Sequence, residues 1–343
     1  MEERFRRLFI ITLSIILCIL VICGGVVYCI DPYQQFRKSD LYINDARLEI
    51  PGISKHHDYN AILIGSSMAM NHEPQQIDSL FSEAGQDKWS TRNFTLVGGM
   101  SDDYDILLNR VFKDGKVKHI IFDFDYFSFA KQRNVIADYL YTDDISNKIK
   151  YVLNYTTLEN CIKKIKTPVR LDSLNHFYSK SGRAELLRDF MKCRNEKFAE
   201  TGYNFDYTVM KLHFDSHILS YIRKRTDIDW IVYFPPYSIF EFVRYRDGGH
   251  FGEIYRFKKY VVEALLKCPN VKIYDFQCEE GWIMNLSEYM DVRHHSHEFN
   301  HEIIRRMSED MYRVTSDNYL EKLEAFDKIV KSADVDKLLE NIS

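Results

Sequence analysis

The stretch Ala61-Ile62-Leu63-Ile64-Gly65-Ser66-Ser67 joins a short apolar run to a glycine and two serines. Four consecutive apolar residues before a turn signal predict a strand buried on both faces, as in a parallel sheet. A serine directly after such a strand would lie at the carboxyl edge of the sheet, where open α/β sheets bind ligands. Ser67 is therefore a candidate nucleophile, and the alternative is that Ser66 and Ser67 only cap the next helix.

Further apolar runs of the same kind follow along the chain: Phe94–Val97, His119–Phe124, Trp230–Phe234 and Val271–Phe276. Apolar residues at helical spacing separate most of these runs, as Ile254, Phe257 and Val261 do before the last one. Alternating strands and helices require right-handed crossovers that place helices on both faces of the sheet. We therefore predict an α/β fold, a three-layer α/β/α sandwich of flavodoxin-like type with a five-stranded parallel sheet.

The N-terminus predicts one transmembrane helix. Residues 8–30 carry no charge and are long enough to cross a hydrocarbon core of about 30 Å. Arginines precede this run and the residues directly after it are not basic, which favours a cytoplasmic N-terminus at residues 1–7 and a body outside the cytoplasm. The run has no Ala-x-Ala site, which favours an uncleaved anchor in the lipid bilayer over a signal peptide. Lipoprotein processing at Cys23 is disfavoured by the bulky Ile22 before it.

The remainder divides into a juxtamembrane segment at 31–58, an α/β domain at 59–314 and a C-terminal amphipathic helix at 315–343. A polar stretch at about 126–202 interrupts the alternation of strands and helices. We interpret it as a helical insertion beside the active-site edge, with helices at Asn147–Leu153 and Ala184–Met191.

Composition excludes some classes of function. A net charge of -4 over 343 residues gives no reason to expect nucleic-acid binding. No C-x-x-C motif occurs, so a zinc ribbon or thioredoxin-like site is not expected. Disulfides are permitted outside the cytoplasm, but buried reduced thiols are at least as compatible with Cys161, Cys193, Cys268 and Cys278.

A second chemical motif, Asp291-Val292-Arg293-His294, follows the last predicted strand. A carboxylate three residues before a histidine can orient its imidazole, which can then take a proton from a serine. Gly98-Gly99 follows the second predicted strand, and a glycine there lets a backbone N–H approach a ligand. Each motif alone is also compatible with an ordinary turn. Their order, each after a predicted strand, favours a triad of Ser67, His294 and Asp291.

The same segment contains a rival motif. His297-Glu298-Phe299-Asn300-His301 matches the zinc-protease pattern H-E-x-x-H, with Glu321 or Glu324 as imaginable third ligands. Ser296 would cap this helix and leave the motif in its exposed first turn. We therefore expect no metal, and we expect His295 and His297 to be surface or substrate-edge residues.

The chain resembles the SGNH/GDSL hydrolase superfamily, and more narrowly its membrane-anchored DltD-like and alginate O-acetyltransferase-like branch. The resemblance covers most of the chain and rests on these segments: Asp31-Pro32-Tyr33 after the anchor, Asp58-Tyr59-Asn60, Gly65-Ser66-Ser67-Met68, Phe234-Pro235-Pro236-Tyr237-Ser238 and the block from Asp291 to His294.

The resemblance implies a role for each residue of the site. Ser67 corresponds to the nucleophile, with Ser66 where many members carry Asp. His294 corresponds to the general base and Asp291 to the acid that orients it, and Gly99 matches the oxyanion-hole glycine. Many members then have an Asn after the third strand, but here Asp123-Phe124-Asp125-Tyr126 occupies that place. One of the usual oxyanion donors is thus missing, and the DltD-like branch also tends to lack this block. We expect Gly99, Ser66 and Asp125 to serve in the oxyanion hole or in substrate binding.

The function implied is that of an extracytoplasmic serine O-acyltransferase in the cell membrane. It would pass an acetyl or D-alanyl type group, through an acyl-enzyme, to a cell-surface polysaccharide or teichoic-acid-like polymer. A multi-spanning membrane acyltransferase (MBOAT) would be its partner, and no cofactor is expected. Two alternatives stay open: an SGNH esterase that removes acyl groups from surface glycans, and a non-catalytic scaffold or glycan-binding subunit of a membrane acyltransferase complex.

Overall fold

The computed structural model describes residues 2–85, 87–133, 136–170, 183–193 and 202–340. The chain forms two compact units. The N-terminal unit contains residues 1–57, 109–114 and 136–174, and the sheet unit contains residues 58–108, 115–135 and 175–343. Each unit is described by itself below.

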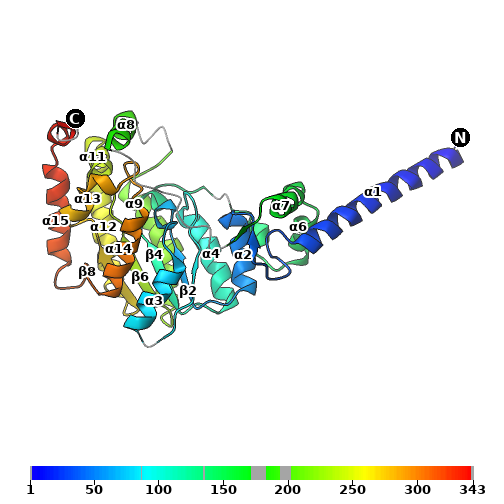
Figure 1. Ribbon diagram of the computed structural model, residues 1–343, viewed down its shortest axis with the longest axis horizontal. Coiled ribbons are helices and arrows are strands. Elements are labelled where there is room, and N and C mark those ends of the chain that lie inside the picture. The colour runs from blue at the N-terminus through cyan, green and yellow to red at the C-terminus, as the bar shows by residue number, and fades with distance from the viewer. Residues whose placement is uncertain (1, 86, 134–135, 171–182, 194–201, 341–343) are drawn as a thin grey trace. The chain divides into compact units, whose positions relative to one another are not determined.

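The sheet unit is built on a six-stranded sheet in the order β3-β2-β4-β6-β7-β8 (Figure 1). Its strands are β2 (Ala61–Ile64), β3 (Thr91–Asn93), β4 (His119–Asp123), β6 (Asp229–Phe234), β7 (Val271–Asp275) and β8 (Arg313–Val314). The first five are parallel to their neighbours, whereas β8 pairs antiparallel with β7. The α/β prediction with five parallel strands is confirmed, and the sheet gains a sixth, antiparallel edge strand, β8, that was not predicted because two residues leave no periodic signal.

The second strand lies three residues earlier than predicted. The paired part of β3 and β2 ends at Asn93. Beyond it, the backbone N–H of Phe94 still donates to the carbonyl of Leu63 (2.8 Å), and that of Leu96 donates to the carbonyl of Gly65 (2.9 Å). Phe94 and Leu96 are fully buried, which explains why this run resembles a strand in sequence. The apolar run therefore continues beside β2 and carries the chain to the edge where the serine motif lies.

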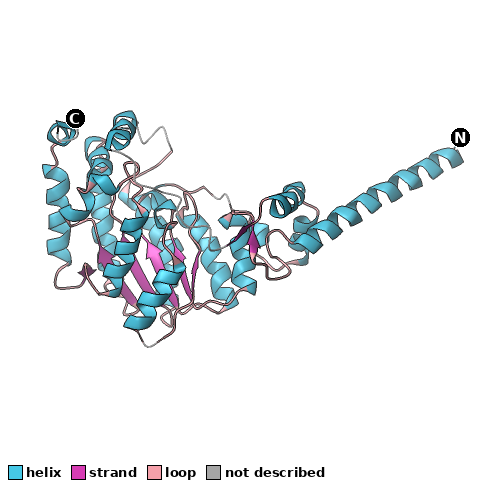
Figure 2. Ribbon diagram, in the orientation of Figure 1, coloured by secondary structure: helices cyan, strands magenta, loops and turns pink. Residues whose placement is uncertain are grey.

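Helices cover both faces of the sheet (Figure 2). α3 (Pro74–Ala84) leads from β2 to β3 and α4 (Ser101–Asp114) leads back across β2 to β4. Right-handed crossovers in opposite directions place these helices on opposite faces. α3 packs against α14 (His297–Ser308), and α12 (Phe251–Leu265) packs against α9 (Tyr207–Phe214).

Shorter helices and the C-terminal helices complete the sheet unit: η1 (Ser67–Ala69), α5 (Phe127–Ala130), α8 (Arg183–Cys193), η5 (Asp215–Leu219), α10 (Ser220–Lys224), α11 (Ile239–Asp247), α13 (Glu280–Ile283), η6 (Leu286–Glu288), α15 (Tyr319–Ser332) and α16 (Val335–Glu340). The single C-terminal helix predicted at 315–343 is thus wrong, because Ala333 adopts an extended conformation and ends α15. Residues 341–343 lie outside the described residues.

The N-terminal unit begins with α1 (Glu2–Ile30), which is long and apolar enough to cross a membrane. Its other elements are β1 (Leu41–Tyr42), α2 (Ala46–His56), η2 (Asp138–Leu140), α6 (Ile145–Val152), α7 (Tyr155–Lys166) and β5 (Val169–Arg170). The segment predicted as one insertion at 126–202 therefore divides between the two units. Its predicted helices correspond to α6 and α8.

Asp31 organises the chain directly after α1. Its carboxylate accepts hydrogen bonds from the backbone N–H groups of Gln35 (2.8 Å), Phe36 (2.8 Å) and Arg37 (3.0 Å), and from the Tyr151 hydroxyl (2.7 Å). Burial is the main cause that raises the pKa of Tyr151, followed by the charge of Asp31. The Asp31-Pro32-Tyr33 motif thus has a structural role inside the N-terminal unit.

Candidate active site

Ser66 and Ser67 follow β2 and have different roles. Ser66 is the N-cap of η1: it is buried and its hydroxyl accepts a hydrogen bond from the backbone N–H of Met68 (3.3 Å). Ser67 is the first residue of η1 and is partly exposed. Capping therefore explains Ser66 but leaves the Ser67 hydroxyl available for chemistry.

The structure brings Ser67, His294 and Asp291 into one chain of hydrogen bonds. Ser67 Oγ lies 2.8 Å from His294 Nε2, and His294 Nδ1 lies 2.6 Å from Asp291 Oδ2. The serine and the histidine are 227 residues apart in sequence. This is the arrangement of a nucleophile, a base and a group that orients the base.

Asp291 is held as a carboxylate. Its Oδ1 accepts the backbone N–H groups of Arg293 (2.8 Å) and His294 (2.7 Å). Burial raises the pKa of the Asp291 carboxyl, but the hydrogen bonds and charge of His294 outweigh burial, and the pKa lies below its usual value. An ionised carboxylate can only accept, so His294 Nδ1 carries the proton and Nε2 is free to accept one from Ser67.

Two further side chains fix the loop that carries the histidine. The buried hydroxyl of Ser238, after β6, donates to the carbonyl of Val292 (2.6 Å). Asp189, on α8, accepts the backbone N–H of Val292 (3.3 Å). The sequence predicts no role for Ser238, although it lies in the Pro-Pro-Tyr-Ser segment after β6, and no sequence signal distinguishes Asp189.

Arg293 secures the same loop from its other side. Its Nε lies 3.1 Å from the buried Glu241, and its guanidinium lies 3.7 Å from the ring centre of Phe127. Burial opposes the charged guanidinium, but Glu241 and nearby acidic groups outweigh it and raise the pKa of Arg293. Glu241 also pairs with Arg244 at 2.7 Å, so one carboxylate is shared by two arginines.

Gly99 and Asp125 both make internal hydrogen bonds. The N–H of Gly99 donates to the Leu96 carbonyl (2.7 Å), so its predicted oxyanion role would require this bond to be shared or broken. Asp125 is buried and its Oδ1 accepts from the Tyr237 hydroxyl and from the backbone N–H of Phe127 (3.0 Å). The oxyanion or substrate-binding roles of Gly99, Asp125 and Ser66 stay predictions.

Asn93 is a supporting residue that sequence reasoning missed. Its amide donates towards the carbonyls of Ala69 (3.4 Å), Met70 (3.3 Å) and His72 (3.2 Å). These carbonyls lie in the segment directly after Ser67. The available sequence signal is the polar Asn93 at the end of β3, the strand that pairs with β2 before Ser67.

The H-E-x-x-H segment forms the first turns of α14, with Ser296 accepting from the backbone N–H of Phe299 (3.2 Å) as its N-cap. Glu298 is exposed and His297 is half-buried, in agreement with the predicted position of the motif. His295 is buried at 2% exposure, so its prediction as a surface or substrate-edge residue is wrong. Tyr289 and Phe299 pack around its ring.

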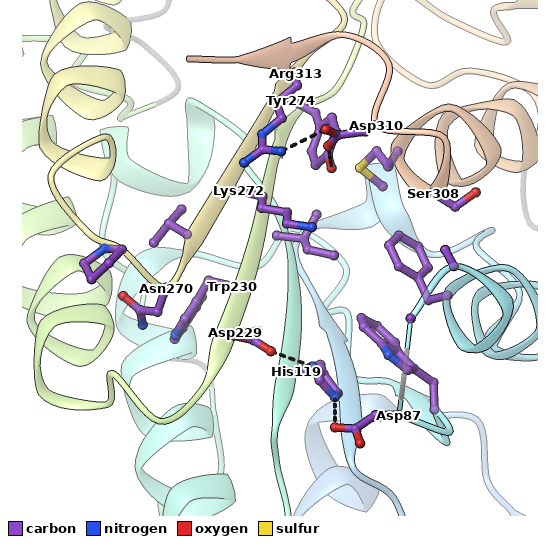
Figure 3. Close-up of a pocket in the computed structure, with 18 residues that line it drawn as sticks. Asp87, His119, Asp229, Trp230, Asn270, Lys272, Tyr274, Ser308, Asp310 and Arg313 are labelled. Carbon is purple, nitrogen blue, oxygen red and sulfur yellow. Dashed lines mark hydrogen bonds and ion pairs between the residues drawn. The ribbon is translucent and has the colours of Figure 1, made fainter. Parts of the chain in front are cut away.

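A cavity of about 620 Å³ lies at the amino ends of the parallel strands, at the opposite edge of the sheet from Ser67 (Figure 3). His119 and Asp229, at the starts of β4 and β6, line it together with Trp89, which stacks on His119 at 4.4 Å. Its described lining includes no residue of the triad.

No protein-family model and no curated protein matches this chain. A solved structure titled "The structure of a putative platelet activating factor from Streptococcus pneumonia" is similar to it. That similarity covers 77% of this chain and 89% of the other, with 12% identity and a TM-score of 0.38. These values are too low to support a functional argument, so the α/β assignment rests on the strands and helices of this chain.

Proposed function

We propose that this protein is a serine O-acyltransferase of the SGNH type, in the DltD-like branch. The observation that carries the proposal is the hydrogen-bonded chain from Ser67 through His294 to Asp291. We further propose that α1 is an uncleaved anchor with its N-terminus in the cytoplasm. The sheet unit would then act outside the cytoplasm on a polysaccharide or teichoic-acid-like polymer, and an MBOAT-type partner would deliver the acyl group across the membrane.

In the first half-reaction, Ser67 Oγ attacks the carbonyl carbon of an acyl donor as its proton passes to His294 Nε2. Asp291 stabilises the imidazolium that forms. The leaving group takes this proton as its bond to the acyl carbon breaks. The product is an ester between Ser67 and the acyl group.

In the second half-reaction, a hydroxyl of the polymer gives its proton to His294 and attacks the Ser67 ester. The ester bond breaks and the proton returns from His294 to Ser67 Oγ. The acyl group is then on the polymer and the enzyme is regenerated. Water in place of the polymer hydroxyl would make the same site an esterase.

A fluorophosphonate probe, which reacts with activated serines, tests the proposed nucleophile. We expect the wild-type full chain to be labelled and Ser67→Ala not to be labelled. Asp291→Asn should slow labelling by about two to four orders of magnitude, because the histidine loses its orienting carboxylate. The matched control Ser66→Ala should still be labelled, since the Ser66 hydroxyl caps η1 and is not part of the hydrogen-bonded chain to His294. An unlabelled wild type would favour a non-catalytic scaffold, and labelling of Ser67→Ala would move the nucleophile.

Mass spectrometry of the surface polymers tests the direction of the reaction. A cell carrying Ser67→Ala should lose acyl groups from one polymer if the protein is a transferase. Accumulation of acyl groups in that cell would instead identify an esterase.

A further inference from the structure

We propose that Glu73, His297 and His301 form a binding site for a divalent transition metal of the zinc class, separate from the serine site. Glu73 is the N-cap residue of α3, and the two histidines lie one turn apart at the start of α14. α3 and α14 pack side by side on one face of the sheet (Figure 1). The third residue is thus Glu73, and not Glu321 or Glu324 as imagined from sequence.

The potential ligand atoms converge. His297 Nε2 lies 2.9 Å from Glu73 Oε1, and His301 Nε2 lies 3.2 Å from Glu73 Oε2. One ligand atom from each residue lies within 4.8 Å of the others. Nitrogen and oxygen ligands bound about 2.0–2.1 Å from a tetrahedral zinc ion lie about 3.3 Å from each other. The two nitrogen–oxygen distances, one to each oxygen of the Glu73 carboxylate, are therefore close to those of an occupied site.

One nitrogen of the cluster makes no hydrogen bond within the described part of the chain. His301 Nε2 is shielded from solvent and forms no hydrogen bond with any described residue, although Glu73 is near. The backbone of His301 is fixed, because its carbonyl accepts from Gln76 on α3 (3.0 Å). A metal ion could bind the lone pair of this nitrogen, which no hydrogen bond to a described residue occupies.

The chemistry of the ligands indicates the class of ion. Two imidazoles and one carboxylate suit zinc and its neighbours in the first transition row, whereas calcium and magnesium prefer oxygen ligands alone. The side chains of His297, Glu73 and His301 are 20%, 25% and 36% exposed, so solvent can supply a further ligand. A bound ion would join the segment after Ser67 to the helix after His294, and so brace both sides of the serine site.

Titration of the metal-free full chain in detergent tests this site. We expect one Zn²⁺ per chain by isothermal titration calorimetry, and visible absorption from Co²⁺ that Zn²⁺ displaces. Glu73→Gln, His297→Asn and His301→Asn should each weaken zinc binding at least tenfold, and the double histidine variant should lose it. Two control variants should bind zinc as the wild type does. They are His250→Asn, at the N-cap of α12, and His294→Asn, in the serine triad.

A measurement on the wild type alone covers the case in which a variant fails to fold. Diethyl pyrocarbonate modifies accessible histidines, and peptide mass spectrometry reports which ones react. Zn²⁺ should protect His297 and His301 and leave His250 reactive. The proposal is overturned if the wild type takes up no stoichiometric zinc, if the Glu73 and histidine variants keep wild-type affinity, or if zinc leaves His297 and His301 unprotected.

Discussion

Two neighbouring histidines, His294 and His295, have opposite surroundings. His294 lies between a serine and a carboxylate, where a proton can enter and leave. His295 is buried, and neither of its ring nitrogens has a hydrogen-bond partner among the described residues. Burial is the main cause that lowers the pKa of His295 to about 4. The sequence His-His therefore joins the proposed general base to a buried, neutral histidine.

This difference predicts a specific acid sensitivity. The folded protein holds His295 neutral, whereas the unfolded chain binds a proton at a pKa near 6.5, so stability is lost as the pH falls from about 6.5 towards 4. The loss between pH 7 and pH 5 should be about 2 kcal/mol. Chemical denaturation of the wild type and of His295→Phe at both pH values measures it. Equal pH dependence in the two proteins would contradict the assignment.

At the scale of the elements, the turn from β2 to η1 depends on a close approach between two parallel strands. A Cβ added at Gly65 would lie 2.5 Å from the Cβ of Asp123 at the end of β4. Asp123 is fully buried, and burial raises the pKa of its carboxyl well above the usual value. Because glycine has no Cβ, the backbone at position 65 can pass close to the end of β4, where the chain turns from β2 into Ser66 and Ser67.

Gly65→Ala should therefore destabilise the protein by about 1–3 kcal/mol, since a methyl group must be forced into a packed core. It should also slow fluorophosphonate labelling, because Ser67 moves relative to His294. The matched control is Gly252→Ala in α12, where an added Cβ meets nothing within 4 Å. That change should be neutral or stabilise by up to about 1 kcal/mol. Similar melting temperatures for the two variants would show that the contact at Gly65 is unimportant.

At the scale of the whole molecule, α1 has two parts. Its apolar residues up to Ile22 are exposed, which suits a lipid environment, whereas Gly24 and Val27 are buried within the N-terminal unit. A Cβ at Gly24 would lie 3.0 Å from Val152 on α6. The last turns of the helix are therefore part of a folded unit, and the first turns are available to a bilayer.

Two deletions separate these parts. Removal of residues 2–22 should release the protein from membranes during carbonate extraction and leave its melting temperature nearly unchanged. Removal of residues 2–30 should also lower the melting temperature, because Gly24 and Val27 leave the N-terminal unit. A protein lacking residues 2–22 that still sediments with membranes would show that another surface anchors it.

Sequence predicted the parts of the fold whose signal is local. Buried runs such as Ala61–Ile64 identify strands by themselves, and the strand ends place Ser67 and His294 at one edge. The edge strand Arg313–Val314 was missed because pairing with β7, and not its own residues, makes it a strand. Asp189 and Glu73 were missed for a similar reason: each acts through a partner more than 100 residues away.

The distance of 227 residues between Ser67 and His294 also orders events during synthesis. At about 5–20 residues per second, a ribosome makes the serine roughly 10–45 seconds before it makes the histidine. Throughout that interval the nascent chain carries a serine with no base to activate it. If Ser67 is the nucleophile, as proposed, it would stay unactivated during synthesis and become reactive only after almost the whole polypeptide has emerged.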